Sequence, residues 1–149
     1  FHSEILAYSP NGNPREVISN DKLHTVYLWG YGDRYPIAEI KNATLAQVET
    51  AVSSVFGMTS SALARNAVPD AAKLKALRKH TSLSKAQVTV FTHLPLIGVP
   101  SITDPTGKTL YYEYDGLGRL QRNYYYENNT MQESEKRVLQ EYDYHYRNQ

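Results

Sequence analysis

Tyrosines and alanines occupy different parts of this chain. All 13 tyrosines lie outside residues 36–110, whereas ten of the twelve alanines fall within residues 42–87. Alanine favours helices, and tyrosine-rich segments with frequent turn residues favour strands. We therefore expect a single α+β domain with a β-hairpin zone at residues 1–41, a helical insertion at 42–87 and a second β zone at 88–149.

The middle zone has clear helix boundaries. Thr44 and Gln47 fit a capping box, in which Thr44 caps the first turn and Gln47 reaches back. Gly57, the one glycine in the zone, is suited to end this helix. An apolar stripe at helical spacing comprises Leu45, Val48, Val52, Val55 and Phe56. We expect a short second helix at 61–67 and a third beginning at Asp70.

The third helix carries several cations on or near its polar side: Lys73, Lys75, Arg78 and Lys79. Two interpretations stay open at this point. The cations form either a basic patch for an anionic partner or an ordinary solvated helix face.

The outer zones alternate with the period of a strand. Tyr27, Trp29 and Tyr31 fall on one face, with Leu28 and Gly30 on the other. The predicted strands are polar for a sheet that is buried on both faces. We therefore expect antiparallel hairpins with one solvated face.

Three four-residue turns share one pattern: Ser9-Pro10-Asn11-Gly12, Asp104-Pro105-Thr106-Gly107 and Asp115-Gly116-Leu117-Gly118. Each begins with Ser or Asp, whose side chain accepts a hydrogen bond from the turn, and each ends with Gly, which tolerates a positive φ. Such turns connect hairpin strands. The pattern predicts hairpins over residues 5–18, 98–114 and 110–126.

Residues 114–120, Tyr-Asp-Gly-Leu-Gly-Arg-Leu, follow the pattern Tyr-Asp-x-x-Gly-Arg-Leu. This segment resembles the Tyr-Asp repeat, also called the RHS repeat, of bacterial proteins; Tyr114, Asp115, Gly118 and Arg119 are its marked positions. Weaker similarity to the same proteins extends over residues 27–31, 35–38, 102–107 and 142–149. The first turn departs from the pattern, because Ser9 stands in place of Asp and Asn13 in place of Arg.

The resemblance implies a secreted or surface-exposed bacterial polypeptide. Repeats of this family assemble into a β-sheet shell that encloses a C-terminal toxin or other cargo, and extracellular relatives contribute to cell contact and carbohydrate binding. The partners it implies are neighbouring repeats of the same polypeptide. Because the chain starts at Phe1 without a signal peptide, we interpret it as an internal piece of a longer protein.

Composition and spacing argue against several other functions. The formal charge of +1 is too small for a generic nucleic-acid surface, and no apolar run is long enough to span a membrane. The chain has no cysteine, and no two histidines have the spacing of a metal pair. Glu113 and Asp115 share a strand face, as would a glycosidase pair, but we interpret Asp115 as a turn residue and Glu113 as a cross-strand partner for a cation such as Arg119.

We therefore expect a non-catalytic structural segment with no cofactor and no metal. The alternative is a carbohydrate- or cell-surface-binding module that uses exposed aromatic faces, since tyrosine and tryptophan stack on sugars. The aromatics named for this role are Tyr27, Trp29 and Tyr31.

Overall fold

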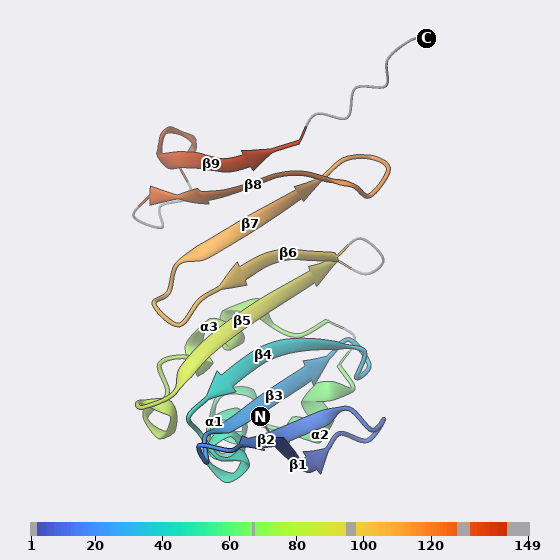
Figure 1. Cartoon of the computed structure of the whole chain (residues 1–149), viewed down its shortest axis with the longest axis vertical. Coiled ribbons are helices and arrows are strands. Elements are labelled where there is room, and N and C mark those ends of the chain that lie inside the picture. The colour runs from blue at the N-terminus through green and yellow to red at the C-terminus, as the bar shows by residue number, and fades with distance from the viewer. Residues whose placement is uncertain (1–2, 67, 95–97, 128–131, 143–149) are drawn as a thin grey trace. The chain divides into compact units, whose positions relative to one another are not determined.

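The computed structural model describes residues 3–66, 68–94, 98–127 and 132–142. Within these residues the fold is a mixed α+β fold, and antiparallel strands pair in chain order from β1 to β9 (Figure 1). Contacts divide the chain into two compact units, residues 1–91 and residues 92–149. We call them the N-terminal and C-terminal units. The described core cluster, which joins the helices to three strands of the sheet, lies within the N-terminal unit.

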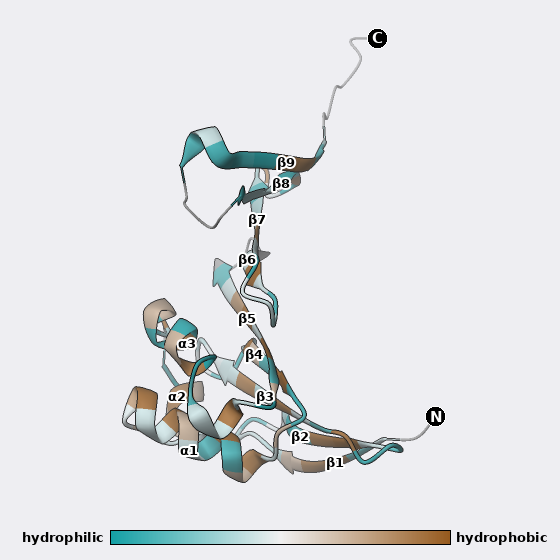
Figure 2. Cartoon of the chain, turned by 90° about the vertical axis from the view of Figure 1, so that its left-hand side faces the viewer, coloured by the Kyte–Doolittle hydropathy of each residue, from teal (hydrophilic) through white to brown (hydrophobic). Residues whose placement is uncertain are grey.

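The N-terminal unit is a sheet with helices on one side (Figure 2). Its strands are β1 (Ser3–Tyr8), β2 (Pro14–Ser19), β3 (His24–Gly30), β4 (Tyr35–Lys41) and the first part of β5 (Gln87–Leu94). Its helices are α1 (Leu45–Phe56), α2 (Ser60–Ala64) and α3 (Ala71–Leu77), followed by a 3-10 turn at Thr81–Leu83.

The hydrophobic core lies between this sheet and its helices. Leu28 of β3 and Ile37 and Ile40 of β4 are fully buried, as are Val52 of α1 and Leu77 of α3. All members of the core cluster fall between residues 26 and 90.

In β3 the buried residues Val26, Leu28 and Gly30 alternate with residues that face the opposite side. In β4 the adjacent residues Ile37 and Ala38 are both buried, at the point where the pairing of β3 with β4 shifts register.

The predicted start and end of the first helix and the predicted start of the third helix are confirmed. Thr44 and Gln47 form both hydrogen bonds of a capping box, and Gly57 ends α1 at a φ of 70°. Asp70 caps α3 by accepting hydrogen bonds from two backbone N–H groups. The second helix starts earlier than expected, because Thr59 supplies its cap. Lys73 and Lys75 of α3 are exposed, which fits both a solvated helix face and a basic patch.

The C-terminal unit contains the end of β5, together with β6 (Gly98–Thr103), β7 (Thr109–Tyr114), β8 (Leu120–Tyr126) and β9 (Lys136–Glu141). None of its described apolar side chains is fully buried. Its buried residues are instead polar: Ser101, Thr103, Thr109 and Asn123.

Side-chain ladders connect neighbouring strands of the C-terminal unit. Thr103 and Thr109 share a hydrogen bond of 2.8 Å between their hydroxyls, and the rings of Tyr111 and Tyr124 stack at 5.5 Å. Lys136 places its ammonium 4.2 Å from the centre of the Tyr124 ring. Such cross-strand pairs contribute about 0.2–1 kcal/mol each, so they stabilise a thin sheet less than a packed core would.

All three predicted turns have the expected backbone geometry. In each turn the N–H of the closing glycine donates to the carbonyl of the first residue, at 2.9 Å for Gly12, 2.9 Å for Gly107 and 3.0 Å for Gly118. These three glycines have positive φ angles of 87°, 95° and 79°. Gly116, at the second position of its turn, has no positive φ.

Replacing Gly118 with alanine should lower the free energy of unfolding of the C-terminal unit by about 1 kcal/mol, because a Cβ is disfavoured at positive φ. No neighbouring atom lies within 4 Å of the added Cβ at Gly118 or Gly116, so backbone conformation alone separates the two positions. Gly116→Ala should be neutral or slightly stabilising.

The measurement is amide hydrogen exchange of β7 and β8 in both variants. Tryptophan fluorescence is unsuitable because the single tryptophan, Trp29, lies in the other unit. A damaging Gly116→Ala alongside a silent Gly118→Ala would show that the turn register is wrong.

Candidate functional site

The alternation of β3 separates two aromatic side chains from the core. Val26 and Leu28 are buried under the helices, whereas Tyr27 and Trp29 are half-buried on the opposite face. Tyr31 does not join them, which corrects the sequence-based expectation. The strand ends at Gly30, and Tyr31 takes a left-handed φ of 54°. This change of direction packs the Tyr31 ring against the core cluster.

Tyr27 and Trp29 instead line a hollow on the open face of the N-terminal unit. Its volume is about 310 Å³, and its walls are Pro14, Tyr27, Trp29, Pro36, Glu39 and Phe91. Strand register brings these residues together from four strands, because Tyr27 lies opposite Glu39 and Trp29 opposite Pro36. We call this feature the aromatic hollow.

Most polar groups of the aromatic hollow are already occupied. The indole N–H of Trp29 donates to the carbonyl of Pro14 at 2.8 Å. The Tyr27 side chain lies near the Glu39 carboxylate. Burial of the Tyr27 hydroxyl is the main cause that raises its pKa above the ordinary value, and the neighbouring Glu39 carboxylate raises it further. Glu39 also lies 3.8 Å from the ammonium of Lys41, which is half exposed.

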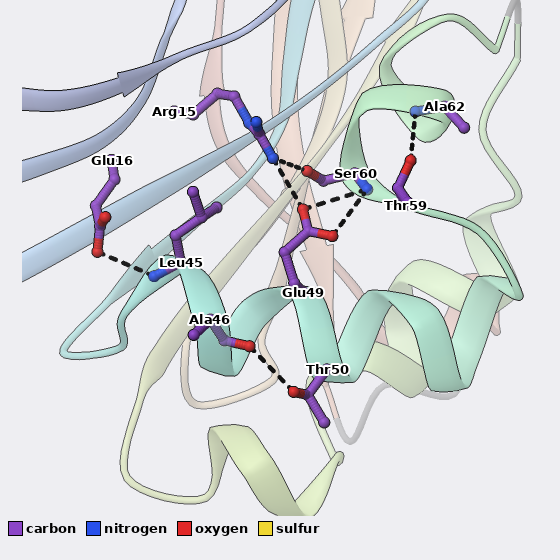
Figure 3. Close-up of polar contacts among 9 residues, drawn as sticks. All are labelled: Arg15, Glu16, Leu45, Ala46, Glu49, Thr50, Thr59, Ser60 and Ala62. Atoms are coloured by element: carbon purple, nitrogen blue, oxygen red, sulfur yellow. Dashed lines mark hydrogen bonds and ion pairs between the residues drawn. The ribbon is translucent and has the colours of Figure 1, made fainter.

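Polar contacts on the helix side fix the strand that carries Pro14. In the pairing of β1 with β2, Ala7 is opposite Glu16 and Tyr8 is opposite Pro14, so Arg15 is an extra residue in a bulge. Arg15 forms a 2.8 Å ion pair with Glu49 of α1 and donates a hydrogen bond to Ser60 of α2 (Figure 3).

The neighbouring Glu16 anchors the start of α1. Its carboxylate accepts a hydrogen bond from the backbone N–H of Leu45 and contacts the ring of His24, both at 2.9 Å. Sequence reasoning missed Arg15, Glu16 and Glu49, because the bulge and its helix partners depend on contacts between distant segments. The one local signal was two adjacent charges inside an otherwise alternating strand.

Asp33, which sequence reasoning also missed, joins two turns of the N-terminal unit. Asp33 is buried and accepts hydrogen bonds from the Ser9 hydroxyl at 2.6 Å and from the Asn11 N–H at 2.9 Å. The turn that contains Gly12 is therefore tied to the turn between β3 and β4. Ser9 stands at the first position of its turn, as Asp104 and Asp115 stand in theirs, and the Asp33 carboxylate approaches it there.

The Tyr-Asp segment lies in the C-terminal unit and forms a compact turn. The Asp115 carboxylate accepts hydrogen bonds from the backbone N–H groups of Leu117 and Arg119 and pairs with the Arg119 side chain at 2.8 Å. The hydrogen bond from the Arg119 N–H is the largest of the effects that hold the pKa of Asp115 below its usual value. Tyr114 precedes the turn at the end of β7 and is half-buried.

Asp104 occupies the equivalent place in the preceding turn. It accepts hydrogen bonds from the Thr106 hydroxyl at 2.6 Å and from the N–H of Lys108 at 3.0 Å. The Thr106 hydroxyl makes the largest contribution to lowering its pKa. Asp104 and Asp115 therefore each accept hydrogen bonds from the backbone of the turn in which they lie.

Glu113 has a cation as its cross-strand partner, as expected, but this cation is Arg122 and not Arg119. Glu113 lies 3.7 Å from Arg122, and Arg122 also lies 3.4 Å from Glu141. Arg119 pairs with Asp115, because the turn holds both side chains together. The similar segment that begins at Tyr142 falls outside the described residues from position 143 onward.

Within the described ranges, no three His, Cys, Asp or Glu residues cluster as metal ligands would. No helix in that part of the chain has the length and apolar character needed to cross a membrane. Comparison with known proteins gives no matching family model and no matching curated protein.

Replacing Glu39 with glutamine should lower the pKa of Tyr27 toward its ordinary value, because it removes the carboxylate charge. Burial remains, so part of the elevation should persist. A raised tyrosine pKa favours the fold below about pH 10, the ordinary tyrosine value, and this contribution is lost as pH rises through the folded pKa.

The measurement is an NMR titration of the tyrosine ring carbons in both proteins. Glu113→Gln in the C-terminal unit is the matched control and should leave Tyr27 unchanged. An unaltered Tyr27 titration in Glu39→Gln would contradict the proposed coupling.

Proposed function

We propose that the chain is a non-catalytic structural segment of a large secreted or cell-surface bacterial repeat protein. In this proposal the hairpins are of the Tyr-Asp repeat type and flank a helical insertion. The segment forms part of a scaffold that encloses or presents a C-terminal effector. The resemblance of residues 114–120 to the repeat supports this assignment.

The observation that carries the proposal is the character of the two outermost strands. Each has a single strand neighbour in the described chain. Ile5, Leu6 and Tyr8 on β1 are 42%, 46% and 56% exposed. Val138 and Leu139 on β9 are 46% and 54% exposed.

Exposed apolar edges are rare in independent sheets, which usually protect their edges with charge, proline or a covering element. Leu6 and Leu139 are extra residues where the pairing of each outermost strand with its neighbour shifts register, so alternation does not assign the pairs Ile5–Leu6 and Val138–Leu139 to opposite faces. All four apolar side chains are nevertheless exposed at the two edges. Strands of adjoining repeats would satisfy the backbone groups and cover these side chains.

A second candidate is a carbohydrate- or cell-surface-binding module. One specific observation favours it, the aromatic hollow, in which Tyr27 and Trp29 face away from the core. This role is compatible with a scaffold, because the hollow and the outermost strands involve different residues.

The edge proposal predicts that the isolated chain self-associates, since each edge lacks its neighbour. A double variant, Leu6→Lys with Val138→Lys, should be monomeric, because a lysine on an edge strand opposes strand addition. Sedimentation velocity over a range of concentrations measures the change.

Leu117→Lys is the matched control, because Leu117 is 75% exposed but lies in a turn. This variant should associate like the unmodified chain. A chain that stays monomeric at high concentration, or a double variant that associates as strongly as the control, would count against the proposal.

A further inference from the structure

The aromatic hollow has a lining that narrows its ligand class. Its volume of about 310 Å³ is close to the lower end of small-molecule sites, which begin near 300 Å³. Three aromatic rings and two prolines form its walls, and Glu39 is its only charged residue.

The lining of the aromatic hollow offers few hydrogen-bonding groups to a sugar. The Trp29 N–H is already bonded to Pro14, and the Tyr27 hydroxyl is influenced by the neighbouring Glu39 carboxylate. A sugar bound here would leave most of its hydroxyls without protein partners, which lowers affinity. A neutral apolar ligand would remove water from the Glu39 carboxylate without replacing its hydrogen bonds.

An organic cation with an apolar surface avoids both penalties. It has few hydroxyls that need protein partners, and its charge compensates the Glu39 carboxylate. The faces of tryptophan, tyrosine and phenylalanine attract a cation through their ring quadrupoles. Alkyl groups on the nitrogen bury against the rings and prolines, while the positive charge compensates Glu39. A strongly hydrated primary ammonium would need hydrogen-bond acceptors that this lining lacks.

Lys41 is the competing cation. Its ammonium is 3.8 Å from Glu39 and its side chain is half exposed. Exposed ion pairs of this kind contribute about 0–1 kcal/mol. A ligand whose charge is held against the aromatic rings can therefore displace it.

We propose that the aromatic hollow binds a small quaternary ammonium ligand, which packs against Tyr27, Trp29 and Phe91 and places its charge beside Glu39. This inference rests on the second candidate function, the binding module, and is independent of the scaffold proposal. It assigns Glu39 as the residue that determines specificity for a cation.

The probe is choline chloride, and the readout is the fluorescence of Trp29, which is the single tryptophan and lines the hollow. The matched neutral probe is 3,3-dimethyl-1-butanol, in which carbon replaces the nitrogen. Choline should change the fluorescence saturably and bind about tenfold or more tightly than the neutral probe.

Two variants should shift choline affinity in opposite directions. Glu39→Gln keeps the shape of the side chain and should weaken binding about tenfold, whereas Lys41→Gln removes the competing cation and should strengthen it by about twofold or more. Far-UV circular dichroism checks that both variants fold. Equal affinity for choline in both variants would overturn the proposal.

Other probes separate the remaining outcomes. Cellobiose binding without a choline response would overturn the ammonium proposal and leave the binding module standing. No response to choline, cellobiose or the neutral probe would overturn both. Vesicles of dioleoylphosphatidylcholine distinguish a free ligand from a lipid headgroup: binding to vesicles without binding to free choline would contradict a small-molecule site.

Discussion

Burial of one face of β3 and β4 under the helices is the interaction on which the N-terminal unit depends. Leu28, Ile37 and Ile40 contribute the sheet side of this core, and α1 and α3 contribute Val52 and Leu77. Each such side chain stabilises the fold by about 1.5–3 kcal/mol when it leaves water. The C-terminal unit has no comparable apolar layer among its described residues.

The same alternation that fills the core creates the aromatic hollow. A strand cannot place two adjacent side chains on one face without a bulge. Once Leu28 is committed to the helices, Tyr27 and Trp29 must therefore face outward. The bulge at Arg15 has the opposite effect on β2. It places two adjacent side chains, Arg15 and Glu16, on the helix side of the sheet. The binding surface and the core thus follow from one strand register.

Local features of the fold could be predicted from the sequence. The cap at Thr44, the stop at Gly57 and the turns that close at Gly107 and Gly118 each depend on a few adjacent residues. The hollow could be predicted only in part. The outward position of Tyr27 and Trp29 could be predicted from strand alternation. The positions of Phe91 and Glu39 beside them could not, because they depend on how separate strands pair.

The missed features depend on contacts between distant segments. Tyr31 leaves the strand because the turn after Gly30 is bonded to the end of α2, where the Asp33 N–H donates to the Ala64 carbonyl at 2.6 Å. A side chain at Gly30 would lie 2.7 Å from Pro69, so the strand must end in a residue without Cβ. Neither Ala64 nor Pro69 is near Gly30 in the sequence, so no local pattern indicates these contacts.

Amide hydrogen exchange of the unmodified chain most directly tests whether the helix-covered sheet carries the stability of the protein. Amides of β3 and β4 should exchange slowest, through global unfolding of the N-terminal unit. Amides of β7 and β8 should exchange at least about tenfold faster, because cross-strand ladders protect them without an apolar core. Equal protection of β7–β8 and β3–β4 would contradict a central role for the core.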